Sequence, residues 1–185
     1  GRASAMTDAR SRTTTDEGSA IAPPTMTAQP PTHGRNGLMS YSTSQIRNVA
    51  LAGHSGAGKT TLFEALLHAG GAIQAAGSLE RGTTVSDFDP MEKARGHSLN
   101  TAIASTDHAG VHLNLIDTPG YPDFRGPTLS AFSAVETVAV VLGATAGIEY
   151  GTRRMMDYAR QRNLCRVLVV NKMDAEPGRL AALLD

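Results

Sequence analysis

The sequence has no excess of either charge and almost no cysteine. Its 185 residues include 17 Lys and Arg against 17 Asp and Glu, so the formal net charge is zero. Binding to nucleic acid through bulk charge needs a basic excess, so we expect no DNA partner. A single cysteine excludes an intramolecular disulfide framework and is typical of a reducing compartment.

Long apolar segments are also missing. The wholly apolar run from Val138 to Leu142 is far too short to cross a bilayer. The N-terminus shows no charged start followed by an apolar stretch, so no secretory signal is predicted. We therefore expect a soluble, cytoplasmic chain with no membrane partner, and the length suits one domain.

Residues 1–44 have the composition of a disordered leader. This segment contains 6 Ser, 8 Thr, 4 Pro and 4 Gly, and its few apolar residues show no period. Such a segment cannot bury enough surface to offset the entropy of ordering it. A targeting or partner-binding role is the alternative. Three methionines, Met6, Met26 and Met39, are candidates for the true start, and Met39 stands just before the patterned region.

From residue 45 onward, apolar strands alternate with helical patterns. Strands are predicted over 46–52, 99–103, 111–117, 137–142 and 167–170, with a turn at 107–110 that makes the second and third a hairpin. Helices are predicted over 59–69, about 122–134 and 150–163, with a last one from near Gly178. Residues 71–98 form a long loop. This order indicates an α/β fold, with a mostly parallel sheet covered by helices on both faces and one antiparallel hairpin strand.

Apolar positions mark the expected faces of these elements. Leu62, Leu66 and Ala69 share one face of the first helix, and Leu99, Thr101 and Ile103 alternate along the first hairpin strand. Cys165 is expected to be a small core residue beside the strand at 167–170. The arginines of the 150–163 helix are interpreted as a solvated face, with contact to ribosomal RNA as the alternative.

A phosphate-binding loop follows the first strand. Residues 53–60 read GHSGAGKT, a Gly followed by four residues and then Gly-Lys-Thr. Glycines let successive N–H groups point at an anion, and the helix N-terminus adds its dipole. Lys59 supplies a charge for the β- and γ-phosphates, and Thr60 offers a hydroxyl to Mg²⁺. We predict nucleotide binding by Gly53, His54, Ser55, Gly56, Ala57, Gly58, Lys59, Thr60 and Thr61.

A second motif, Asp117-Thr118-Pro119-Gly120, stands at the end of the strand expected beside this loop. The strand-end Asp117 can hold Mg²⁺, usually through water. The N–H of Gly120 can meet the γ-phosphate. Both residues therefore join the predicted nucleotide site.

A third motif, Asn171-Lys172-Met173-Asp174, follows the last apolar strand. A carboxylate at Asp174 can accept the N1–H and the N2 amino group of guanine, which adenine lacks, and a site built around such an acceptor rejects the analogue. Asn171 can bond the far edge of the base, and the stem of Lys172 can cover its face. The three motifs in this order predict GTP rather than ATP, and they disfavour an ATP-dependent kinase.

Residues 46–178 resemble the G domain of translational GTPases, and most closely that of elongation factor G and the elongation factor G-like proteins. The resemblance is carried by GHSGAGKTTL, GTTVSDFDP…RGHSL, NLIDTPGYPDF and VVNKMD. It implies a P-loop NTPase fold, hydrolysis of GTP to GDP with Mg²⁺, and the ribosome as partner of the full-length protein, through ribosomal RNA and ribosomal proteins. It also makes residues 80–98 and 117–124 the two nucleotide-sensing switches.

The resemblance assigns roles to particular residues. Thr60, Asp117 and Ser98 are the expected metal ligands, Ser98 standing where the family usually has threonine. Lys59, Gly120 and Tyr121 are the catalytic candidates. Tyr121 replaces the family's water-positioning histidine, and a phenol with a pKa near 10 cannot act as an imidazolium. Gly56 stands where elongation factors often have Asp. We therefore expect slow or differently tuned hydrolysis.

Two alternatives stay open at this point. One is a GTP-binding switch that hardly hydrolyses GTP, and the other is a ribosomal protection protein of the tetracycline-resistance type. The ribosomal step, translocation, recycling or another task, is left open too. Residues 45–185 are expected to be an incomplete G domain cut from a longer factor, because the family's last guanine-contacting loop should follow Asp174. The strand at 167–170 would then be an uncovered apolar edge, with weak nucleotide affinity and poor solubility as consequences.

Overall fold

The computed structural model describes residues 41–86, 89, 91–92, 98–120, 125–180 and 183. The predicted leader up to residue 40, His97 in the first switch and Tyr121 in the second therefore lie outside the described residues. The elements, in chain order, are η1 (Thr43–Gln45), β1 (Ile46–Ala52), α1 (Lys59–Ala69), β2 (Ala102–His108), β3 (Val111–Asp117), α3 (Arg125–Ala131), β4 (Thr137–Gly143), α4 (Tyr150–Gln161) and β5 (Cys165–Asn171).

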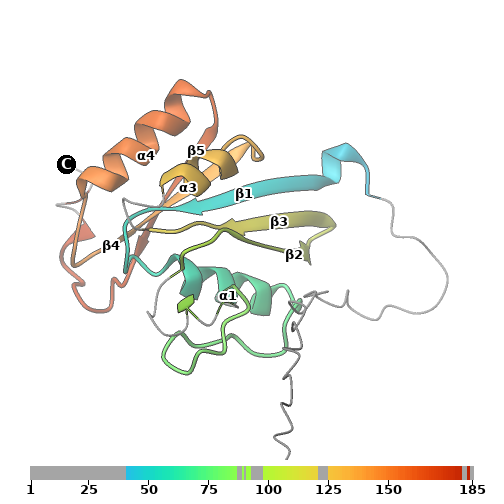
Figure 1. Ribbon diagram of the computed structural model, residues 1–185, viewed down its shortest axis with the longest axis horizontal. Coiled ribbons are helices and arrows are strands. Elements are labelled where there is room, and N and C mark those ends of the chain that lie inside the picture. The colour runs from blue at the N-terminus through green and yellow to red at the C-terminus, as the bar shows by residue number, and fades with distance from the viewer. Residues whose placement is uncertain are drawn as a thin grey trace, which may run out of the picture.

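The described strands form one mixed sheet in the order β2-β3-β1-β4-β5. β1 is parallel to both β3 and β4, and β4 is parallel to β5. Of these strands, only β2 runs antiparallel, as the hairpin partner of β3. In Figure 1, α1 lies on one side of the sheet while α3 and α4 lie on the other. The predicted α/β architecture, with helices on both faces and one antiparallel strand, is confirmed.

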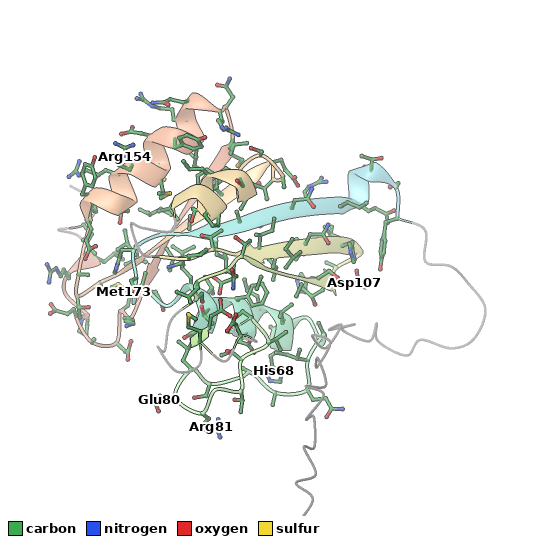
Figure 2. The ribbon with its side chains drawn as sticks, in the orientation of Figure 1. His68, Glu80, Arg81, Asp107, Arg154 and Met173 are labelled. Atoms are coloured by element: carbon green, nitrogen blue, oxygen red, sulfur yellow. The ribbon has the colours of Figure 1, made fainter. Side chains whose placement is uncertain are left out.

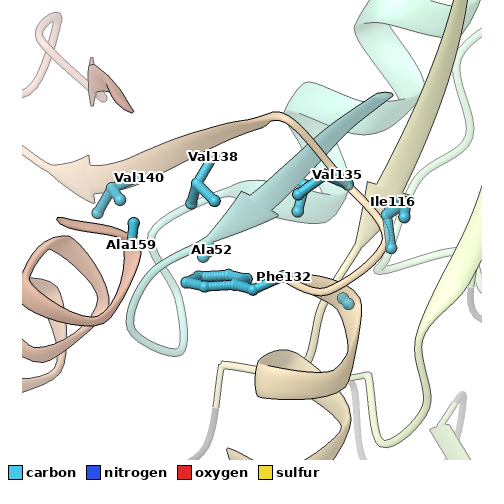
Figure 3. Packing of buried hydrophobic residues seen from close by; sticks show 9 residues of the cluster. Ala52, Ile116, Phe132, Val135, Val138, Val140 and Ala159 are labelled. Carbon is cyan, nitrogen blue, oxygen red and sulfur yellow. The ribbon is translucent and has the colours of Figure 1, made fainter. Parts of the chain in front are cut away.

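Strand periodicity explains why the core has two halves. Side chains alternate across a strand, so Ala50 and Ala52 of β1 face one side while Leu51 faces the other. The first side packs against Phe132, which follows α3, and against Ala159 of α4, as Figure 3 shows. The second side packs Leu51 against residues of α1. The last part of β1, from Ala50 to Ala52, is thus buried on both faces, as expected for a parallel strand covered by helices on both sides.

The buried face of α1 differs from the expected one. Leu66 is 38% exposed, whereas the buried stripe is Thr60, Phe63, Glu64 and Leu67. These positions follow the i, i+3, i+4, i+7 spacing of a helix face. The prediction was wrong because two members of the stripe are polar. The predicted stop is confirmed, since Gly71 (φ 77°) and Ala72 donate to His68 and Leu67 in a Schellman motif.

The hairpin strand β2 is shifted from its predicted range of 99–103 to residues 102–108. Its turn is shorter than expected, because only Ala109 (φ 49°) and Gly110 (φ 79°) stand between the strands. Positive φ at both positions is the geometry of a type I′ turn, which matches the strand twist. Ile103 is 70% exposed while Thr106 is buried. The apolar alternation therefore indicated the wrong face of this strand.

Tyr41, assigned above to the leader, packs against the sheet. The hydroxyl of Tyr41 donates to the carboxylate of Asp107 at 2.9 Å. The Tyr41 ring also stacks on His112 of β3, with 4.5 Å between centroids. Tyr41 therefore contacts the sheet, although it precedes the boundary predicted at residue 45.

The strand β5 is the exposed edge of the sheet. Val167 is 45% exposed and Leu168 39%, as expected for an uncovered strand. Cys165 at its start is exposed too, so the prediction of a core cysteine was wrong. The reason is position, because β5 has a strand neighbour on one side only. Within the described part of the chain, no helix is both long enough and apolar enough to cross a membrane.

Candidate functional site

The predicted site residues gather where the parallel strands end. β1, β3, β4 and β5 share one direction, so their carboxyl ends meet at the same edge. β1 leads to the loop at 53–58, β3 ends in Asp117 and β5 ends in Asn171. The chain moves from β3 on one side of β1 to β4 on the other, which makes this edge a topological switch point. Ligands of open α/β sheets bind at such points.

The loop at 53–58 has the backbone of a phosphate cradle. Gly58 has a φ of 93°, in the left-handed region, and directly precedes the first residue of α1. A Cβ at this position would collide with the side-chain amide of Asn171. Only glycine meets both conditions without strain. The first N–H groups of α1 therefore lie next to the loop, where an anion is favoured.

Lys59 lies inside this loop rather than in solvent. Its side chain is 6% exposed, and its Nζ donates to the carbonyl oxygen of His54 at 2.9 Å. Burial lowers the pKa of Lys59, and the nearby charge of Asp117 opposes that shift. A buried ammonium group with a main-chain acceptor is poised to meet an anion at the mouth of the loop.

The three predicted metal ligands converge. The hydroxyl of Thr60 donates to Oδ2 of Asp117 at 2.7 Å, and its Oγ1 lies 3.2 Å from Oγ of Ser98. The three residues come from α1, β3 and the long loop, and Thr60 and Asp117 are buried. Two hydroxyls and a carboxylate are the hard oxygen ligands that Mg²⁺ prefers. The donor set fits a Mg²⁺ ion.

Gly120 lies close to the phosphate loop. A Cβ there would collide with Nζ of Lys59 and would lie 2.8 Å from the main chain of Ser55. Thr118 fixes this segment by donating to the carbonyl oxygen of Leu51 at 2.7 Å. The structure thus brings Gly120 close to Lys59. Tyr121, the next residue, lies outside the described part.

The residues predicted to contact the base form a more open group. Asn171 Nδ2 donates to the carbonyl oxygen of Ala57 at 3.0 Å, and its Oδ1 accepts from the N–H of Lys172 at 2.9 Å. Lys172 has a φ of 59°, an uncommon conformation for a side chain of its kind. Lys172 and Asp174 are exposed. Figure 2 shows Met173, between them, at the side of the molecule toward which the arrow of β1 points.

His54 joins the phosphate loop to β4. Its Nε2 accepts from the N–H of Gly143 at 3.4 Å, which leaves Nδ1–H to donate to the carbonyl oxygen of Ser55 at 2.7 Å. Glu149 lies 3.9 Å from Nδ1. The ring is buried and anchors the loop. Within the described residues, no group of three or more His, Cys, Asp and Glu could hold a metal ion.

Two buried glutamates were not identified from the sequence. Glu64 of α1 is fully buried and accepts from the N–H groups of Gly77 and Val85. Glu92 is 1% exposed and accepts from Leu99 N–H at 2.9 Å and Asn100 N–H at 2.8 Å. Charged residues are expected at the surface, so nothing in the residue type indicated that either glutamate is buried. The one available signal was the position of Glu64 four residues after Thr60, on the same helix face.

Comparison with known proteins supports the same interpretation of the motifs. The family described as "Elongation factor Tu GTP binding domain" matches residues 44–184. The elongation factor G-like protein of Mycobacterium tuberculosis (strain CDC 1551 / Oshkosh) is 40% identical over 129 residues, which are 70% of this chain and 18% of that protein. Peptide chain release factor 3 of Gloeothece citriformis (strain PCC 7424) is 37% identical over 145 residues, 76% of this chain and 27% of that protein.

Solved structures agree with the sequence relatives. A crystal structure of a Thermus thermophilus protein matches with a TM-score of 0.73 and 41% identity, over 76% of this chain and 21% of that one. The chain thus spans no more than 27% of the length of these three relatives. The likeness concerns one part of each longer protein. The family match over residues 44–184 includes the phosphate loop and the strand ends described above.

Proposed function

Because the chain belongs to the elongation factor Tu GTP-binding domain family, whose members are GTPases, we propose that it binds GTP with Mg²⁺ and hydrolyses it to GDP and phosphate. The observation that carries this proposal is the convergence of Lys59, Thr60 and Asp117 at the carboxyl edge of the sheet. Phosphoryl transfer needs positioning and charge stabilisation more than covalent chemistry, and this group of residues supplies both.

Each residue of the phosphate end has a separate task in this proposal. Lys59 places its charge against the β- and γ-phosphates, and the N–H of Gly120 meets the γ-phosphate. Thr60, Ser98 and Asp117 hold Mg²⁺, which neutralises charge on the phosphate oxygens when bound. The burial of Lys59, Thr60 and Asp117 excludes water and strengthens their electrostatic contacts.

Selection of guanine rests on the turn after β5. Asp174 accepts from the N1–H and N2 amino groups, Asn171 bonds the far edge, and the stem of Lys172 covers the face of the base. The tie between Asn171 and Ala57 supports this proposal, because it holds the turn beside the phosphate loop. Competition by ATP tests the assignment. Strong displacement of bound GDP by ATP would overturn it.

We further propose an elongation factor G-like role on the ribosome, in the cytoplasm, with residues 45–185 as part of a G domain. The printed names of the relatives, an elongation factor G-like protein and a peptide chain release factor, support a translational role. A ribosome-dependent rise in GTP hydrolysis is the expected result. A rate that ribosomes leave unchanged would favour the alternative of a GTP-binding switch with little hydrolysis.

Tyr121 separates these two versions of the function. A phenol cannot take up the proton that an imidazole can, so the parent protein is expected to hydrolyse GTP slowly. Single-turnover hydrolysis of Tyr121→His, measured beside the parent with and without ribosomes, is expected to be about tenfold faster or more. An unchanged or lower rate in the variant would contradict this role of Tyr121.

A further inference from the structure

The long segment between α1 and β2 is held by two buried carboxylates. Glu64 accepts from Gly77 N–H at 2.8 Å and from Val85 N–H, and so holds the first part of the segment. This part lies on the side of α1 away from the sheet in Figure 1, and Glu80 and Arg81 mark its outer end in Figure 2. Glu92 holds the last part. The two carboxylates are buried alike but act on different stretches of chain.

Glu92 accepts hydrogen bonds from the main chain directly after Ser98. One carboxylate oxygen, Oε1, accepts from Leu99 N–H at 2.9 Å and Asn100 N–H at 2.8 Å, and Oε2 accepts from Asp89 N–H at 3.3 Å. Hydrogen bonds from main-chain N–H groups to a buried carboxylate are among the stronger ones in proteins. The two residues after Ser98 are therefore fixed relative to Glu92.

Ser98 itself reaches the proposed metal site. Its Oγ lies 3.2 Å from Oγ1 of Thr60, which in turn bonds Asp117. A serine lacks the methyl group that restricts the χ1 angle of threonine, so its hydroxyl has more rotamers available. The orientation of the Ser98 hydroxyl therefore depends more on the position of the main chain.

We propose that Glu92 is a positioning residue for the Mg²⁺ site: by holding the N–H groups of Leu99 and Asn100, it places the hydroxyl of Ser98 beside Thr60. This inference rests on the proposed function, since it concerns the ion held by the same three oxygens. Glu92 does not contact the ion or the nucleotide. It acts through Ser98, and the loss of its carboxylate should appear as weaker Mg²⁺ dependence rather than as weaker phosphate binding in general.

The test is the affinity of the full chain for a non-hydrolysable GTP analogue and for GDP, titrated over a range of Mg²⁺ concentrations. Glu92→Ala and the milder Glu92→Gln are expected to reduce the Mg²⁺-dependent gain in analogue affinity, by about tenfold for the alanine variant. GDP affinity measured in chelator is expected to stay within about twofold of the parent. If Glu92→Ala does not fold, Glu92→Gln alone decides.

Two further variants separate positioning from a purely structural role. Ser98→Ala should lose the same Mg²⁺-dependent gain, and Glu92→Gln added to it should lose almost nothing more, because both act through one hydroxyl. Glu64→Gln is the matched control, with equal burial and two main-chain partners far from Ser98 in sequence. It is expected to lower the melting temperature while leaving the Mg²⁺ dependence unchanged.

Three outcomes would overturn the inference. Losses from Glu92→Gln and Ser98→Ala that add in the double variant would mean that Glu92 acts independently of Ser98. Equal changes in Mg²⁺ dependence for Glu64→Gln and Glu92→Gln would mean that any buried carboxylate of the segment has this effect. A parent protein that binds no GTP analogue would overturn the proposed function itself, and the inference with it.

Discussion

The two ends of the candidate site are built differently, although both lie at the same edge of the sheet. At the phosphate end, Lys59, Thr60 and Asp117 are buried and already hydrogen-bonded within the protein. At the end proposed to hold the base, Lys172 and Asp174 are exposed, and Asn171 is hydrogen-bonded to Ala57 of the phosphate loop. Pre-organised groups lose little entropy on binding, whereas exposed side chains must be ordered by the ligand. We therefore expect affinity to come chiefly from the phosphate end and selectivity from the base end.

The largest expected effect follows the removal of the buried ammonium group. Lys59→Met should weaken GDP and GTP binding by about a hundredfold or more, near 3 kcal/mol, because it deletes the charge aimed at the phosphates. Lys172→Met at the base end is the matched control. It keeps the apolar stem that covers the base and should weaken binding by only about threefold. Equal losses in the two variants, measured by titration calorimetry, would remove the distinction between the ends.

Lys59→Met is also expected to change how the free energy of unfolding depends on pH. Burial lowers the pKa of Lys59 below 10.5, despite the opposing charge of Asp117. Between the lowered value and 10.5 the unfolded chain binds more protons than the folded one, so stability rises with pH across that window. Lys59→Met should remove the contribution of Lys59 to this rise in stability with pH. Urea unfolding of the nucleotide-free protein at about pH 8 and about pH 10 checks it, and an unchanged slope would contradict it.

The next largest effect concerns the oxygen ligands. Thr60→Ala or Asp117→Asn should reduce nucleotide affinity in the presence of Mg²⁺ by about ten- to a hundredfold, as expected for the loss of a group that holds or orients the ion. In chelator, affinity for GDP should change far less. Thr60→Ser, which keeps the hydroxyl, serves as the control. A loss of the same size with and without Mg²⁺ would show that these oxygens do not hold the ion.

A change at the base end should alter selectivity instead. Asp174→Asn replaces one acceptor oxygen by a donor, so it should reduce the preference for GDP over IDP, whose base lacks the N2 amino group, by about tenfold. Binding of inorganic pyrophosphate, which has no base, should be unaffected. A preference that survives the substitution would assign guanine selection to other residues.

The smallest expected effect compares two glycines of the loop. Both have positive φ, 77° at Gly56 and 93° at Gly58, but of the two only Gly58 has a neighbour, Asn171, with which a Cβ would collide. Gly56→Ala should cost about 1 kcal/mol of stability, for the strained backbone alone. Gly58→Ala should cost about 2 kcal/mol or more, because the clash adds to the strain. Thermal melts of the two variants measure the difference.

Sequence reasoning was most successful where backbone geometry dictates residue type. The phosphate loop, the strand-end Asp117 and the turn after β5 were all located by spacing, because glycine at a left-handed position or a carboxylate at a strand end leaves a local pattern. The motifs assigned Thr60 and Asp117 to the metal site, and the resemblance added Ser98. Their distances required the fold, since 38 residues separate Thr60 from Ser98 and 57 separate it from Asp117.

Some failures of the sequence analysis concern polar residues in buried positions. Glu64 on the buried stripe of α1 and Thr106 of β2 are buried although their side chains are polar. Ile103 and Cys165 made the opposite error, being apolar or small and yet exposed. Hydrophobic periodicity cannot identify a buried carboxylate whose partners are main-chain N–H groups elsewhere in the chain. Those partners belong to the long loop, where no periodic pattern exists.

The hydrogen bond from Asn171 to Ala57 makes the outermost strand a support of the phosphate loop. β5 ends at Asn171, so any shift of this strand along its neighbour β4 moves the amide that holds a loop carbonyl in place. The sheet edge and the phosphate cradle are thus mechanically linked across 114 residues of sequence. Pyrophosphate, although it has no base, is therefore expected to bind more weakly once Asn171 is replaced by alanine.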